Sequence, residues 1–218
     1  NNTDDPTETH TDGGHGTSVA GIISAEKDNS LGSFGIAYNS ELAGFNFLES
    51  TFNDNEVDSI GGSAKSEIMD IFNMSYGSYF EDTYSLPGSV DIYDYYQANR
   101  DTFKTSESNG KVFIKSAGNS FRSGLNCLDY VSNPSLSEAL SCGGTEFDLR
   151  HQFSEIIVVA SVNADGIKSS YSTPGSAIWV SGLGGEYGLD ERYTESYPNQ
   201  LGPAIMTTDT SGCSSGYS

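Results

Sequence analysis

The sequence predicts an α/β fold in which a mostly parallel sheet is flanked by helices. Short apolar runs bounded by Gly, Asn, Asp or Pro recur along the chain, and such runs are typical of strands buried on both faces. Between them lie segments whose apolar side chains recur at helical spacing. This alternation favours a parallel sheet. The 218 residues suffice for one domain, over 1–218, with a substantial core.

Five segments are predicted to be strands, each from a short apolar run. Because both faces of such a strand are covered, it needs no alternation of polar and apolar residues. The predicted strands are 41–48, 71–77, 111–118, 156–162 and 177–182.

Three segments are predicted to be helices: 15–26, 63–71 and 89–106. The first begins at a histidine among glycines, and its inner face of small residues would let it approach the sheet closely. Segments 49–62 and 119–148 are rich in Asn, Asp, Ser and Gly and are predicted to be long loops. Loops at the carboxyl ends of parallel strands usually form the site.

The charge balance makes nucleic acid an unfavourable partner. The chain has 30 acidic and 10 basic residues and a net charge of -20, so it repels a phosphate backbone. An acidic surface attracts cations, keeps a protein soluble in brine or selects basic substrates, and composition does not choose among these. No apolar run reaches the roughly 18 residues that span a bilayer, so we expect no membrane segment.

The cysteines fit a secreted protein. Cys127 and Cys142 flank a loop-like segment and are a reasonable disulfide in an oxidising compartment. Cys213 is left over, either as a free thiol or with a partner in sequence outside this chain.

Two side chains stand where chemistry could occur. His15 lies between glycines at the start of the first predicted helix, which leaves its imidazole accessible. Asn119 follows the predicted strand 111–118, and its amide can donate a hydrogen bond to an oxygen that becomes negative during acyl transfer. A lone histidine more often caps or packs, and a lone asparagine more often forms a turn. The stretches around His15 and Asn119 occur in this order along the chain, and together they are a more specific functional signal than either residue alone.

The chain resembles the subtilisin-like serine proteases, in particular the kexin-like branch of processing enzymes and its bacterial relatives. HGTSVAGIISA is similar to the family's catalytic-histidine helix, NMSYGS to its substrate-binding strand, and SAGNS to its oxyanion-hole segment. GIAYNSELAG, YSTPGSAIWVSGLGGE and IMTTDTSGCSS resemble further family segments. The resemblance implies a subtilisin-like three-layer α/β/α fold and a serine endopeptidase whose partner is an extended polypeptide substrate.

The resemblance also implies a role for each matching residue. His15 would be the general base that takes the serine proton and returns it to the leaving amine, and Asn119 would hold the oxyanion. One segment would pair with the substrate backbone as an added strand, and another would line the first specificity pocket. In order, these residues are Ser75, Tyr76 and Gly77, then Ser116, Ala117 and Gly118.

A preference for basic substrates is a further implication. Asp12 stands three residues before the histidine, where kexin-like enzymes keep an acid that faces a basic substrate side chain. A buried carboxylate can prefer Arg or Lys, because a neutral side chain would leave it unpaired. Further acids flank the binding strand: Glu56, Asp58, Glu81 and Asp82.

Calcium is the cofactor that the resemblance implies. In the family a loop soon after the histidine wraps a calcium ion with carbonyl oxygens and one asparagine side chain, and oxygen ligands suit this hard cation. By position the ligands would be the side chain of Asn29 and the carbonyls of Glu26, Leu31 and Ser33. A plain surface turn is the alternative.

Two parts of the family pattern do not occur in these residues. No strand carrying the orienting aspartate precedes His15, and no Gly-Thr-Ser motif supplies the nucleophile. We therefore expect the chain to be the central part of a secreted, extracellular or periplasmic peptidase domain, truncated at both ends and inactive alone. The alternatives are a catalytically dead calcium- or peptide-binding relative, and an unrelated α/β binding domain that matches by chance.

Overall fold

The computed structural model describes residues 14–46, 54–77, 90–121, 141, 143–188 and 202–209. The chain divides into two compact units, the first made of Asn1–Asn55 with Met206–Ser218 and the second of Glu56–Ile205. The prediction of one domain over all 218 residues stays a prediction. Among the described residues no helix is long and apolar enough to cross a membrane.

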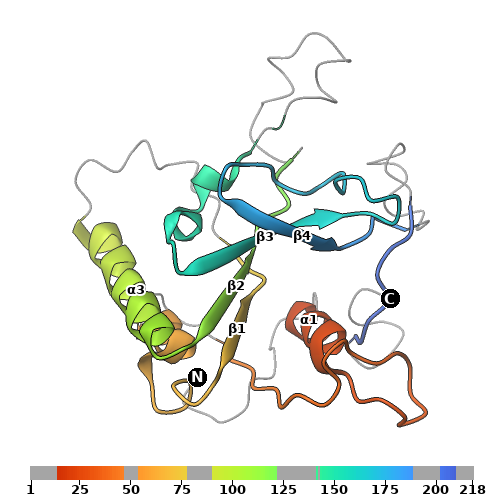
Figure 1. Cartoon of the computed structure of the whole chain (residues 1–218), viewed down its shortest axis with the longest axis horizontal. Coiled ribbons are helices and arrows are strands. Elements are labelled where there is room, and N and C mark those ends of the chain that lie inside the picture. The colour runs from red at the N-terminus through yellow and green to blue at the C-terminus, as the bar shows by residue number, and fades with distance from the viewer. Residues whose placement is uncertain are drawn as a thin grey trace. The chain divides into compact units, whose positions relative to one another are not determined.

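A four-stranded sheet forms the centre of the second unit (Figure 1). Its strands lie in the order β1-β2-β3-β4, and every neighbouring pair is parallel. The strand bounds are β1 Ile71–Met74, β2 Val112–Ser116, β3 Ile156–Val162 and β4 Ile178–Leu183. This confirms the predicted parallel sheet and four of the five predicted strands.

The core of this unit lies where the sheet meets α3, Val90–Ser108 (Figure 1). Phe113 of β2 stacks on Phe72 of β1 with ring centroids 4.9 Å apart, and Phe103 of α3 meets Phe113 edge-on at 4.8 Å. Burying each phenylalanine removes apolar surface from water and contributes about 1.5–3 kcal/mol. Phe103, an apolar residue of the segment 89–106 that was predicted to be a helix, therefore packs α3 against the sheet.

Short helical pieces connect these elements. They are α2 Asp54–Val57, a π-helical turn at Asp58–Gly62, and two 3-10 helices at Thr145–Phe147 and Leu149–Gln152. The first two occupy 54–62, so the predicted loop at 49–62 is wrong for that part.

The predicted helix at 63–71 is also wrong. Residues 63–69 form turns, and residue 71 begins β1. The hydroxyl of the buried Ser66 accepts hydrogen bonds from Gly61 N at 3.0 Å and Ser63 N at 3.3 Å, and it donates to Asp58 O. Such side-chain bonds to the local backbone compete with a helix.

The predicted strand at 41–48 is wrong for its described part, because residues 41–46 form no strand. Residues 47 and 48 lie outside the described residues. The apolar run that suggested the strand leaves Leu42 55% exposed. It therefore lacks the burial that stabilises a parallel strand.

Helix α1, His15–Ser24, belongs to the first unit, and its predicted close approach to the sheet stays a prediction. Its close partner is the segment at 207–208. Thr207 Oγ1 donates to Ser18 O at 2.6 Å, and Thr208 Oγ1 donates to Thr17 O at 2.7 Å. A Cβ at Gly21 would stand 2.7 Å from Thr207 Oγ1, so only glycine permits this approach.

We predict opposite effects for two glycines of α1. Gly21→Ala should lower the free energy of unfolding by about 1–3 kcal/mol, because the new methyl collides with hydroxyls that are held by hydrogen bonds. Gly16→Ala is the matched control: a Cβ there meets nothing within 4 Å, so it should raise that free energy by up to about 1 kcal/mol. Urea unfolding of the three proteins measures both. Equal effects would contradict the packing.

Candidate functional site

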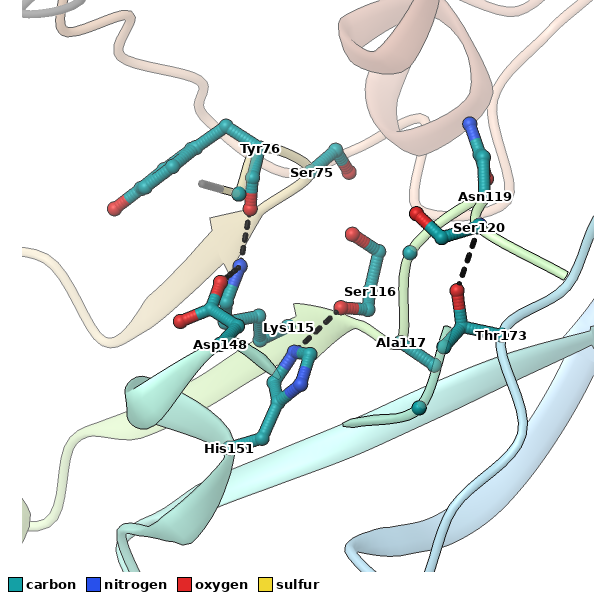
Figure 2. A pocket seen from close by; sticks show the side chains of 13 residues that line it. Ser75, Tyr76, Lys115, Ser116, Ala117, Asn119, Ser120, Asp148, His151 and Thr173 are labelled. Carbon is teal, nitrogen blue, oxygen red and sulfur yellow. Dashed lines mark hydrogen bonds and ion pairs between the residues drawn. The ribbon is translucent and has the colours of Figure 1, made fainter. Parts of the chain in front are cut away.

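A pocket of about 260 Å³ lies where β1 and β2 end. The carboxyl edge of a parallel sheet is the place where α/β proteins bind ligands. Figure 2 shows the residues that line it, all from the second unit. They are Ser75, Tyr76, Gly77, Lys115, Ser116, Ala117, Gly118, Asn119, Ser120, Gly144, Asp148, His151 and Thr173.

The pocket has two walls that the sequence analysis had singled out separately. The first wall, 75–77, follows β1, and the second wall, 116–120, continues from β2. The structure therefore brings the residues predicted to pair with a substrate backbone beside those predicted to line a specificity pocket. Their binding roles stay predictions.

Three hydrogen bonds, to Val159 and Thr173, hold the second wall. Ala117 N donates to Val159 O at 2.9 Å, and Thr173 N donates to Gly118 O at 3.0 Å. Ser120 N donates to Thr173 Oγ1 at 2.8 Å (Figure 2). Gly118 has a φ of 101°, a left-handed conformation that glycine adopts without strain. This turn leads to Asn119, which is exposed at the pocket.

His151 supports the second wall from below. Its Nε2 lies 2.9 Å from Ser116 O, and its Nδ1 lies 2.9 Å from Thr145 O. The imidazole is buried, and both ring nitrogens face carbonyl oxygens. His151 therefore connects the wall to the first 3-10 helix, a role that the sequence analysis did not anticipate.

A network of four buried charges lies beneath both walls. Lys115 Nζ is 3.1 Å from Asp148 Oδ2, and Arg150 Nη1 is 3.3 Å from Asp148 Oδ1. Arg150 also binds Glu56 in a bidentate pair, with Nε–Oε1 at 2.8 Å and Nη2–Oε2 at 2.9 Å. The four side chains are between 1% and 7% exposed. Two carboxylates and two cations leave the network without net charge.

The surroundings shift the pKa values of this network. Burial lowers the pKa of Lys115, and the Asp148 carboxylate offsets this only in part. Burial alone would raise the pKa of Asp148, but the charges of Lys115 and Arg150 hold that pKa below its ordinary value. Burial opposes the charge of Arg150, yet its bonds to Glu56 raise the pKa above the usual range. These surroundings favour the ionised forms of Asp148 and Arg150, whereas burial opposes the charge of Lys115.

Tyr76 joins the first wall to this network. Its hydroxyl donates to Glu56 Oε1 at 3.0 Å, and its carbonyl accepts from Lys115 Nζ (Figure 2). Burial, followed by the charge of Glu56, raises the pKa of the phenol well above its ordinary value. Tyr76 thus stays neutral and donates its proton throughout the neutral range.

The network corrects the expectation that Glu56 faces a substrate. Both of its carboxylate oxygens are bound inside the protein, and the residue is 2% exposed. Asp58 is exposed. The other acids predicted to flank the cleft, Asp12, Glu81 and Asp82, lie outside the described residues.

One signal in the sequence could have pointed to the network. Lys115 interrupts the apolar run of β2, and a charge inside a strand that is buried on both faces needs a partner. The sequence does not show which carboxylate pairs with Lys115. The cysteine predictions, for Cys127, Cys142 and Cys213, concern residues outside those described.

His15 occupies the first position of α1 and is exposed. It belongs to the first unit, whereas Asn119 belongs to the second. The expectation that the two side chains act on one substrate therefore stays a prediction.

The predicted calcium loop is a tight turn with a left-handed backbone at every second residue. Asp28, Ser30 and Gly32 have φ values of 64°, 63° and 50°. Asn29 Oδ1 accepts a hydrogen bond from Leu31 N at 2.9 Å. Within the described residues no group of three or more His, Cys, Asp or Glu could hold a metal, but the predicted ligands here are carbonyl and amide oxygens.

The parallel sheet with helices makes this an α/β protein. Its pocket lies at the carboxyl edge of the sheet, where α/β proteins usually bind their ligands. The model of the subtilase family matches residues 1–213, and the chain belongs to that family. The family resemblance drawn from the sequence is thereby confirmed.

The chain is 38% identical, over 220 residues, to an extracellular serine protease of Aeromonas sobria, covering 98% of this chain and 32% of that protein. A crystal structure of the Aeromonas sobria serine protease in complex with a chaperone superimposes with a TM-score of 0.77 at 35% identity, over 99% of this chain and 34% of that one. Human neuroendocrine convertase 2 is 35% identical over 63 residues, which are 29% of this chain and 10% of that protein. The chain spans about a third of the length of its Aeromonas relative.

We predict that the buried charges depend on one another. Arg150→Met should lower the free energy of unfolding by about 3–5 kcal/mol, because it leaves two buried carboxylates with a single cation. Arg100→Met is the control: Arg100 is exposed on α3, and its loss should change that free energy by no more than about 0.5 kcal/mol. Chemical denaturation provides both values. A similar, small effect of both substitutions would contradict a buried network.

Proposed function

We propose that the protein containing these residues is a secreted serine endopeptidase. The observation that carries the proposal is that, in a subtilase-family chain, the segments 75–77 and 116–120 form the two walls of one pocket. An extended peptide pairs with the first wall as an added strand. The carbonyl of the peptide bond to be cleaved then lies near Asn119.

The reaction is acyl transfer. His15 takes the proton of a nucleophilic serine as the serine oxygen attacks the peptide carbonyl carbon, and it then gives that proton to the leaving amine. Asn119 donates its amide hydrogen to the carbonyl oxygen, which carries the negative charge of the tetrahedral intermediate. Water repeats the sequence to release the acyl group. These 218 residues show neither the family's serine motif nor its aspartate-bearing strand, and we propose that they do not hydrolyse peptides by themselves.

Two further features belong to the proposal. Secretion is supported by the Aeromonas sobria relative, which is described as extracellular, and that protease also forms a complex with a chaperone, a kind of partner that would suit this protein as well. The proposed preference for basic substrates rests on Asp12 and on the acids predicted to flank the binding strand, Asp58, Glu81 and Asp82. Glu56 is no longer part of this set, because it is bound inside the protein.

We predict that two substitutions in the full protein affect turnover while leaving folding intact. His15→Ala should nearly abolish peptide hydrolysis, because no base activates the nucleophile. Asn119→Ala should lower kcat about a hundredfold or more, as expected for the loss of one oxyanion donor. Steady-state kinetics on a library of peptides measures both and identifies the residue before the cleavage site.

The kinetic outcomes are distinct. Cleavage after Arg or Lys supports the basic preference, and cleavage after large apolar residues contradicts it without affecting the protease assignment. A full protein that neither cleaves peptides nor reacts with a serine-directed phosphonate is the catalytically dead relative instead.

Calcium is the proposed cofactor, held by Asn29 Oδ1 and the carbonyls of Glu26, Leu31 and Ser33. These oxygens fit a hard cation, and Asn29 Oδ1 keeps a second lone pair beside the one that binds Leu31 N. The ion would stabilise the turn that follows α1. It takes no part in the proton transfers.

We predict that calcium raises the melting temperature of the chain. At about a hundred times the dissociation constant the ion should add about 2.7 kcal/mol to the free energy of unfolding. Thermal melting in millimolar calcium, in magnesium and in chelator measures this, and Asn29→Ala should remove the calcium effect. An unchanged melting temperature in calcium would contradict the site.

A further inference from the structure

Tyr76 is held at both of its ends by one closed ring of interactions. Its carbonyl oxygen accepts from Lys115, and its hydroxyl donates to Glu56. Glu56 binds Arg150, Arg150 binds Asp148, and Asp148 binds Lys115. The ring therefore fixes the backbone and the phenol of the central residue in the first wall.

The two cations of this closed set of interactions also lie close to the aromatic ring of Tyr76. Lys115 Nζ lies 5.1 Å from the ring centroid, and Arg150 Cζ lies 5.9 Å from it. Such cation–π contacts restrict the rotation of the phenol further. A Cβ at Gly77 would stand 3.0 Å from Asp148 Oδ2 and 3.4 Å from Lys115 Nζ. The first wall thus rests directly on the ring.

Lys115 connects the two walls. Its backbone is the residue of β2 that immediately precedes Ser116, the start of the second wall, while its ammonium binds Tyr76 O in the first wall (Figure 2). The side chain is 1% exposed and salt-bridged to Asp148. It is therefore placed to set the separation of the walls and is too enclosed to touch a substrate.

We propose that Lys115 is a positioning residue for substrate binding, which holds the first wall at the separation from the second wall that an extended peptide requires. The inference rests on the proposed function, because that function makes 75–77 the strand with which the peptide pairs. Tyr76 O accepts a hydrogen bond from Lys115 Nζ and keeps a second lone pair, so the peptide can still pair with the backbone of residues 75–77. Misplacing such a segment by even 1 Å is enough to reduce catalysis strongly.

The test compares two substrates of the full protein. In Lys115→Met, kcat/KM for an extended peptide should fall about tenfold to a hundredfold, mainly through KM. A small activated ester makes no strand contacts, so its kcat/KM should change less than about twofold once active sites are counted with a phosphonate probe. Lys104→Met is the control, because Lys104 is exposed on α3 and should leave both substrates unaffected.

Two further variants keep the test decisive if Lys115→Met does not fold. Lys115→Met with Asp148→Asn removes the ion pair without leaving an unbalanced charge, and it should show the same selective loss. Tyr76→Phe removes the hydroxyl that donates to Glu56 but keeps the carbonyl that accepts from Lys115, so it should show a smaller loss of the same kind. An equal fall for peptide and ester, or no fall for either, would overturn the proposal. A wild-type protein that cleaves neither substrate would instead refute the proposed function.

Discussion

The second unit is organised around the burial of one ammonium group. Lys115 lies in β2, a strand with neighbours on both sides and a buried aromatic core beneath it. An isolated charge there would be very costly, so the fold has to bring a carboxylate to it. Asp148 meets that need from the segment between the two 3-10 helices. Asp148 also binds Arg150, and Arg150 binds Glu56. Tyr76 joins these residues through its bonds to Glu56 and Lys115.

Such a network is better suited to defining geometry than to adding stability. The attraction within a buried ion pair is largely offset by the loss of hydration, whereas removing one partner is strongly destabilising. Each member here has several partners in fixed directions, including the bidentate contact between Arg150 and Glu56. The network therefore ties together three segments of the chain, those that carry Glu56, Lys115 and Arg150. Because Tyr76 is bonded to this network, the position of the first wall is fixed with it.

The two walls are held by different means, and both supports are buried. The second wall depends on hydrogen bonds with Thr173, Val159 and His151. The first wall depends on the ion-pair network, to which Tyr76 is bonded. A binding site with walls locked by supporting side chains needs little reordering when a ligand enters. In the first unit, the hydroxyls of Thr207 and Thr208 donate hydrogen bonds to α1. They can come this close because Gly21 has no side chain.

Local pattern by itself determined most of the sheet and the longest helix. The β-branched run IIVVASV specifies β3 at the predicted bounds, and the helical repeat specifies α3 to within two residues. The predictions for 41–46 and 63–69 were wrong because such short runs show too little periodicity. The first segment is exposed and forms no strand, and in the second the buried Ser66 hydroxyl bonds to the local backbone in place of a helix. The family motifs in the sequence also indicated the pocket walls, since strand ends in a parallel sheet meet at one edge. Only the tertiary structure decided the charge network, because Glu56 and Arg150 are 94 positions apart. An acidic side chain looks the same in sequence whether it faces solvent or a buried guanidinium, and burial alone distinguishes the two.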